Sequence, residues 1–349
     1  MRHIGWLLSS MLMLLLLMMV SCSQDSSNDG IDEPQNNLLR LSSVTRSSSG
    51  FTPSEGNSIK MYVMTKNGQF STGTFTYSTG WTNNNVSVKE YEQYYMYGFM
   101  PAGTYQSSIS ATASDLNNDY SRGADLTIQD LPIFTSEDIC AIVGVQKIST
   151  TDDTNAIVEG NYGYLSGLSA ENYVNLLMDH LYGELKLQFK VDADYHALRH
   201  IRLKSVTLKY KNGEGEAAAK VNVTVRLRNG NGLGLNSVVY TPSGNKASHN
   251  ILENASTALS DVAVPIGDPI KCPPSLFDQA GTYMTLSCTY DVCGTNDAVI
   301  RSNCTAENKM RVSGMEHGKT NTVTVTIAPT YLYVLTDPDL DNPTIYIGG

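Results

Sequence analysis

The last 23 residues, IAPTYLYVLTDPDLDNPTIYIGG at positions 327–349, decide how the rest of the chain is interpreted. They predict two short strands, Tyr331–Leu335 and Thr344–Ile347, joined by a turn that contains Pro338 and Pro343. Proline has no N–H and a fixed φ, so neither proline fits inside a paired central strand. The two strands are more apolar than an ordinary frayed chain end. The tail therefore either completes its own sheet or adds to the sheet of another molecule.

The beginning of the chain predicts export. Arg2 and His3 precede the apolar run Leu7–Val20, which is too short and wrongly flanked for a spanning helix and is typical of a secretory signal. The run closes with Ser21 and Cys22, and a small residue before a cysteine resembles the lipobox of bacterial lipoproteins. That resemblance implies a signal peptide over residues 1–21 and acylation of Cys22, for example by palmitate. Ordinary cleavage nearby, with Cys22 incidental, is the alternative.

Charge and composition exclude one class of partner. The full chain has a net charge of −10, and loss of Arg2 with the signal peptide changes it to −11. Nucleic-acid binding needs a basic patch, so we expect no nucleic-acid partner. The polar residues 22–37 contain no apolar pattern and predict a disordered tether.

Four of the five cysteines beyond residue 22 lie in one short region. In an exported protein this spacing favours one or two disulfides among Cys272, Cys288, Cys293 and Cys304. Zinc is the alternative, although no C-x2-C pair is present. The connectivity stays open, and Cys140 in its apolar stretch is expected to be a small buried residue.

Alternation of apolar and polar residues predicts strands through most of the chain. Residues 58–64 and 185–191 alternate with period two, and Asn67-Gly68 is a hairpin signal between the first of these and the next strand. The alternation over residues 201–210 slips by one, which predicts a β-bulge near Lys204-Ser205. Ser169–Leu181 has helical spacing and a capping serine, so it is the best helix candidate.

These patterns together predict an all-β fold of two antiparallel β-sandwich domains with a short helix near their junction. The expected boundaries are 38–181 for the N-terminal sandwich, 182–328 for the C-terminal sandwich and 329–349 for the tail. We predict no enzyme, because no nucleophile–base pair or complete metal motif appears. His196 and His200 lack the glutamate of a metalloprotease helix, so we expect neither a metal nor another cofactor.

Several loose motifs over nearly the whole chain resemble the fimbrillin family, the pilus-subunit lipoproteins of Bacteroidetes. The matching segments are Val20-Ser21-Cys22, Val44-Thr45-Arg46, Tyr94–Pro101, Leu131–Ile139, Met178–Leu185 and Gly318–Ile327. The region 272–304 has no counterpart in the resemblance.

The resemblance implies transthyretin-like sandwiches and a specific assembly route. A lipid-anchored precursor reaches the outer membrane, an arginine-specific protease removes the first strand, and C-terminal strands of another pilus subunit fill the vacated groove. In this chain the removed strand would be residues 38–46, with the cut after Arg46 or, as second choice, Arg40. The donor residues would be Tyr331, Tyr333, Leu335, Ile345 and Ile347.

The residues favour this route independently. Leu38, Leu39, Leu41 and Val44 form an apolar strand that ends at a basic residue and a Ser/Gly link. A tail that buries four or five apolar side chains supplies on the order of 10 kcal/mol. We therefore expect a pilin of a cell-surface fimbrium that supports adhesion by donor-strand exchange. The alternative is a lipid-anchored surface adhesin, a tip, anchor or monomeric protein that binds a host protein or glycan.

Overall fold

The computed structural model of the chain defines the fold for most residues after position 36. The described residues are 37–46, 51–111, 118–147, 157–167, 172–212, 215–216, 218–228, 238–244, 248–277, 281–310, 312, 314–329 and 344–348. The signal peptide, Cys22 and the tether up to residue 36 lie outside them. No helix among the described residues is long and apolar enough to cross a membrane.

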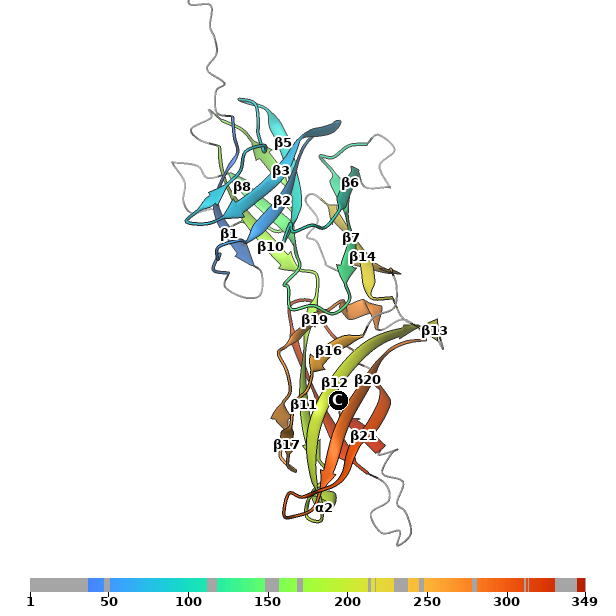
Figure 1. Ribbon diagram of the computed structural model, residues 1–349. Coiled ribbons are helices and arrows are strands. Elements are labelled where there is room, and N and C mark those ends of the chain that lie inside the picture. Colours follow the sequence, from blue (N-terminus) through green and yellow to red (C-terminus); the bar gives the residue numbers. More distant parts are fainter. Residues whose placement is uncertain are drawn as a thin grey trace, which may run out of the picture. The chain divides into compact units, whose positions relative to one another are not determined.

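The fold is all-β, as predicted, and most ladders are antiparallel (Figure 1). A single turn of helix, α2 (Ala193–His196), and the short 3-10 helix η3 (Pro274–Leu276) interrupt the strands. Two pairings are parallel: β1 with β10, and β11 with β22. One short helix is therefore present, α2, but it lies outside residues 169–181, where the helix was expected.

The largest sheet has eight strands in the order β1-β10-β8-β5-β2-β3-β4, and β9 pairs with β5. Its strands are β1 (Arg40–Arg46), β2 (Ser58–Thr65), β3 (Gly68–Tyr77), β4 (Trp81–Thr82), β5 (Gln93–Met100), β8 (Cys140–Lys147), β9 (Gly163–Leu165) and β10 (Tyr173–His180). Strand β2 is buried on both faces: Ile59, Met61 and Val63 join one hydrophobic cluster, whereas Tyr62 and Met64 join another. This sheet therefore contributes to two separate cores.

A four-stranded sheet, in the order β15-β14-β7-β6, shares the second of these cores. Its strands are β6 (Ser107–Ala111), β7 (Gly123–Pro132), β14 (Lys220–Arg228) and β15 (Val238–Ser243). The pairing of β14 with β7 brings residues 220–228 beside residues 123–132, across the predicted boundary between residues 181 and 182. The boundary itself stays a prediction.

The remaining strands form two further sheets. The first, in the order β18-β11-β22-β23 with β19 paired to β11, contains β11 (Gly183–Val191), β18 (Val264–Pro265), β19 (Ile270–Cys272), β22 (Thr320–Ala328) and β23 (Thr344–Gly348). The second, in the order β13-β12-β20-β21 with β16 and β17 paired to β12, contains β12 (His200–Asn212), β13 (Gly215–Glu216), β16 (His249–Leu252), β17 (Thr257–Leu259), β20 (Thr282–Cys293) and β21 (Val299–Met310).

Two local predictions are confirmed. The chain turns between Thr65 and Gly68, where Asn67 and Gly68 were expected to form a hairpin. Strand β12 shifts its register against β20 between Leu203 and Ser205, which is the bulge expected from the slip in alternation.

The helix predicted for residues 169–181 is wrong. Residues 173–180 form strand β10, which lies between β8 and β1. Its inward side chains are Val174, Leu176, Met178 and His180, so an alternating pattern was present beneath the helical spacing. Pairing on both edges selects the strand, because tertiary contacts override a weak local preference.

The disulfides predicted for the cysteine-rich region do not form in the structure. Cys272, Cys288, Cys293 and Cys304 are all buried thiols. The ladder explains this outcome, because Cys288 lies opposite Ala306, Cys293 opposite Val299, and Cys304 opposite Tyr290. No two of these cysteines are therefore direct cross-strand partners on β20 and β21. Cys140, as expected, is a buried small residue.

Candidate functional site

Strand β1 occupies the edge of the eight-stranded sheet and also closes one of its cores. It runs parallel to β10 on one side, and on the other side Leu39, the residue just before the strand, donates its N–H to the carbonyl of Val86 at 2.8 Å. The Asn83 amide also donates to the carbonyl of Leu39 at 2.6 Å. We call the space between β10 and residues 83–88, which β1 fills, the β1 slot.

The core behind the slot is hydrophobic, and β1 together with Leu39, the residue before it, supplies three of its side chains. Leu39, Leu41 and Val44 are 1%, 6% and 6% exposed. They pack in the same cluster as Val174, Leu176 and Met178 of β10. Removing β1 would expose this core and the edge of β10 together, which is strongly unfavourable in water.

A bulge in β1 decides which way its last residue points. Leu41 lies opposite Val174, Ser43 opposite Asn175, and the register shifts at Ser42 between them. Beyond the bulge Val44 points inward and Thr45 outward. Arg46 then follows the inward side, where Met178 is its partner on β10. The predicted cleavage residue is consequently largely buried, with 12% of its side chain exposed.

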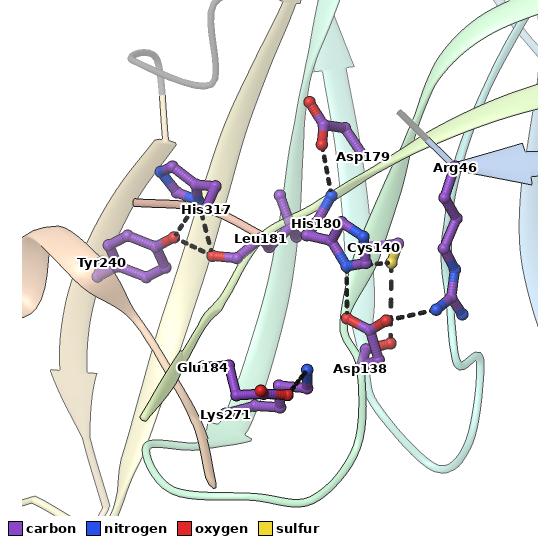
Figure 2. Close-up of polar contacts among 10 residues, drawn as sticks. All are labelled: Arg46, Asp138, Cys140, Asp179, His180, Leu181, Glu184, Tyr240, Lys271 and His317. Carbon is purple, nitrogen blue, oxygen red and sulfur yellow. Dashed lines mark hydrogen bonds and ion pairs between the residues drawn. The ribbon is translucent and has the colours of Figure 1, made fainter. Parts of the chain in front are cut away.

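The Arg46 guanidinium is held by an acidic and an aromatic side chain. Its Nη1 donates to Oδ2 of Asp138, and its Cζ lies 4.2 Å from the centroid of the Phe51 ring. The second oxygen of Asp138 lies 2.7 Å from Nδ1 of His180 (Figure 2). Asp138, His180 and Phe51 together form what we call the Arg46 receptor. The Nε of Arg46 is buried and has no partner among the described residues, so the contact differs from a two-pronged guanidinium–carboxylate pair.

The charges around Asp138 favour its ionised form. Burial raises the pKa of Asp138, but the hydrogen bond and charge of His180 and the charges of Arg46 and Lys271 outweigh it, so the pKa lies below its ordinary value. The neighbouring thiol behaves in the opposite way. Burial, together with the charge of Asp138, raises the pKa of Cys140 well above its ordinary value. Asp138 therefore supplies a carboxylate to the receptor at neutral pH, whereas burial keeps the Cys140 thiol protonated.

Two receptor residues, Asp138 and His180, also lie close to Cys140 in an arrangement that could hold a metal ion. Among the described residues, Asp138, Cys140 and His180 offer ligand atoms that all lie within 4.8 Å of one another. A metal would need the Cys140 thiolate, whose formation burial opposes, and it would compete with the guanidinium already on Asp138. The arrangement fits a guanidinium better than a metal ion.

Arg40, the second predicted cleavage residue, lies in a different setting. Its Nη1 donates to the Tyr173 hydroxyl at 3.1 Å, in an exposed contact at the other end of β1. Its guanidinium lies 5.4 Å from the centroid of the same ring. The two candidate cut sites therefore differ in access: Arg40 is at the surface, and Arg46 is enclosed.

The C-terminal tail is described only at its end. Strand β23 pairs with β22 in antiparallel register, with Ile345 opposite Ile327 and Ile347 opposite Val325. It occupies the last position of its sheet order, with β22 as its ladder partner. The other predicted donor residues, Tyr331, Tyr333 and Leu335, lie outside the described residues. Among the described strands, the tail end is thus an edge strand of its sheet.

Comparison with solved structures gives matches along most of the chain. A fimbrial protein from Bacteroides vulgatus superposes with a TM-score of 0.51 at 12% identity, over 89% of this chain and 98% of that one. This chain has the fold of a Bacteroidetes fimbrial protein. Two more distant matches are a fimbrial protein from Bacteroides ovatus and the fimbrial anchor protein Mfa2 from Porphyromonas gingivalis. The first has a TM-score of 0.33 and 10% identity over 82% of this chain and 48% of that one. The second has a TM-score of 0.32 and 11% identity over 88% of this chain and 96% of that one. No family model and no curated protein sequence matches.

Within this fimbrial fold, sequence reasoning identified Arg46 but missed its receptor. Asp138 lies in the segment Leu131–Ile139 of the resemblance, and His180 lies in residues 169–181, where a helix was expected and strand β10 forms. Phe51 received no role. The available signal was the spacing of Leu39, Leu41 and Val44, whose change of phase, like that at residues 204–205, places Arg46 on the inward side.

Proposed function

We propose that this protein is a structural subunit of a cell-surface fimbrium, polymerised by protease-triggered donor-strand exchange and supporting adhesion. The chain is exported as a lipoprotein and held at the outer membrane by acylated Cys22. An arginine-specific protease then cuts after Arg46, or after Arg40, and releases the segment that contains β1. The C-terminal strands of another pilus subunit take its place.

One observation supports this proposal above the others: β1 is an edge strand that nevertheless fills a core. It lies in one hydrogen-bonded ladder with β10, yet Leu39, Leu41 and Val44 bury side chains worth about 1.5–3 kcal/mol each. Such a strand can leave without unravelling the rest of its sheet. The apolar core and the edge of β10 that it leaves exposed favour the binding of another strand.

The other half of the exchange is the tail, residues 329–349. The edge position of β23 supports its use as a donor, because an edge strand can be detached from β22 alone. A joint between the slot of one molecule and the tail of the next is head-to-tail. Such a joint does not close on itself, so it generates a filament.

The test uses the purified full chain and an arginine-specific protease. We expect cleavage to produce ladders that resist SDS, with each step adding one subunit, and mass spectrometry to place the new N-terminus at Ser47. The control is the double variant Arg46→Ala, Arg40→Ala, which removes both candidate cut sites and whose folding is checked by circular dichroism. Identical ladders from this variant would contradict the proposal, as would complete cleavage without any ladder.

The alternative function, a lipid-anchored adhesin at the tip or base of a fimbrium or acting as a monomer, has its own supporting feature. Val299 and Ile300, at the start of β21, expose 52% and 55% of their surface. Apolar side chains that form a contiguous surface patch mark contact sites, and these two are the candidate for such a patch under this alternative. Replacing both by serine would weaken adhesion to a host protein or glycan without changing ladder formation if this alternative holds.

A further inference from the structure

The proposed removal of β1 has an electrostatic consequence for the groups that it leaves behind. The cut after Arg46 takes the guanidinium away with the leaving segment, but Phe51, Asp138 and His180 all follow the cut and stay with the subunit. Asp138 is 21% exposed and His180 only 6% by side chain. The subunit would keep a partly buried carboxylate that has lost the guanidinium on its Oδ2, although its Oδ1 still contacts His180. Removing one partner of a partly buried charge is destabilising.

The receptor therefore demands a particular kind of replacement. The carboxylate accepts the Nη1 hydrogen bond, and the Phe51 ring lies under the guanidinium. A carboxylate beside an aromatic face is chemistry that selects arginine over an uncharged side chain. Its place in the slot is fixed too, because Arg46 lies opposite Met178, beyond the two apolar positions that face Val174 and Leu176.

The tail of this chain does not carry that chemistry. Residues 327–349 contain Asp337, Asp339 and Asp341 but no lysine and no arginine. A second copy of this tail in the slot would not replace the guanidinium on Asp138 and would bring further negative charge with it. The slot of one molecule is thus mismatched to the tail of another copy in charge, although both are apolar.

We propose that the Arg46 receptor selects the incoming strand: it takes an extended segment of a different subunit that carries arginine opposite Met178. This inference rests on the proposed function, since it concerns the slot after β1 has left. At the β1 slot, this subunit would therefore join a different kind of subunit rather than a second copy of itself. The tail of this chain enters the slot of another kind of subunit.

The test measures how peptides enter the cut protein. The full chain is cleaved after Arg46, and fluorescent peptides displace the nicked segment, with binding followed by anisotropy and release by mass spectrometry. Three peptides are compared: residues 38–46 as they stand, the same peptide with Arg46→Gln, and residues 327–349. Asp138→Asn removes the receptor charge. The matched control is Glu137→Gln. Glu137 is adjacent to Asp138 in sequence, but its carboxylate accepts a hydrogen bond from the Tyr105 hydroxyl.

We expect the arginine peptide to bind about tenfold tighter than the glutamine peptide, the effect of one charge-assisted hydrogen bond. Asp138→Asn should remove this preference, and Glu137→Gln should keep it. The tail peptide should bind no tighter than the glutamine peptide. Equal binding of the first two peptides, or a tail peptide that binds as tightly as the arginine peptide, would overturn the inference.

A separate outcome concerns the proposed function itself. If the nicked segment never leaves and no peptide enters, strand exchange fails as the assembly route. The receptor is then judged in the uncut chain by a double-mutant cycle of Arg46→Gln and Asp138→Asn, read from urea unfolding. Coupling of at least about fivefold in the unfolding equilibrium constant supports the receptor, and additive effects refute it.

Discussion

Burial of Arg46 makes a quantitative prediction about proteolysis. A trypsin-like protease must bind the whole arginine side chain, but only 12% of the Arg46 side chain is exposed in the folded chain. Cleavage after Arg46 therefore requires the end of β1 to open first. When opening and closing are fast compared with cutting, the cleavage rate follows the equilibrium population of the open form.

The substitution Asp138→Asn changes that population in a calculable way. It removes a charge-assisted contact worth about 1.5–3 kcal/mol while it keeps the shape of the side chain. The lower end of that range applies, because Asp138 is 21% exposed and Nε of Arg46 lacks a partner. A change of about 1.4 kcal/mol is a factor of ten. We expect cleavage after Arg46 to be about ten times faster in the variant.

The assay measures initial rates at two sites in the same chain by mass spectrometry at low protease concentration. Arg40, which contacts Tyr173 at the other end of β1, is the internal reference, and its cleavage rate should change less than that at Arg46. An unchanged rate at Arg46 in the variant would refute the reasoning. So would a wild-type chain that is cut at Arg46 as fast as the urea-unfolded chain.

Three further predictions concern stability and the thiols. The pKa of Asp138 is lowered in the folded state, so its ionised form stabilises the fold above about pH 4, and this contribution is lost as pH falls through the lowered value. The unfolding free energy of the wild type should therefore fall more steeply than that of Asp138→Asn between about pH 5 and about pH 3. Parallel curves would contradict this prediction. Leu41→Ala should cost about 2–5 kcal/mol in urea unfolding because Leu41 is buried, whereas Ser42→Ala, on the exposed bulge, should change stability by less than about 0.5 kcal/mol; equal effects would contradict the slot geometry. Burial raises the pKa of Cys288 to about 12, so thiol reagents should react only after unfolding, and the thiol count in denaturant should be the same with and without reductant; a lower count without reductant would indicate disulfides.

Much of the architecture could be predicted from the sequence because alternation is a local property. The all-β fold, the hairpin at Asn67-Gly68 and the bulge at residues 204–205 each follow from side chains within a few positions of one another. Strand β10 was missed because Leu176, Leu177 and Leu181 fit a helical period as well as Val174, Leu176 and Met178 fit a strand. Only its pairing with β8 and β1, which are distant in sequence, separates the two.

The candidate site was predictable only in part, for the same reason. Arg46 could be identified as the basic end of an apolar strand. Its receptor could not, because Asp138 and His180 come from segments about 90 and 130 residues away, and no local pattern reports which of them meet. The pairing of β14 with β7 is a similar long-range contact that alternation could not assign.

The bulge at Ser42 has a thermodynamic meaning for exchange. The positions that face Val174, Leu176 and Met178 are evenly spaced along β10, but the resident strand reaches them with one surplus residue. A bulged residue is left unpaired and disrupts the ladder locally. An evenly alternating strand would satisfy the same positions with an unbroken ladder, so under the proposed exchange we expect the incoming strand to bind more tightly than the bulged resident strand.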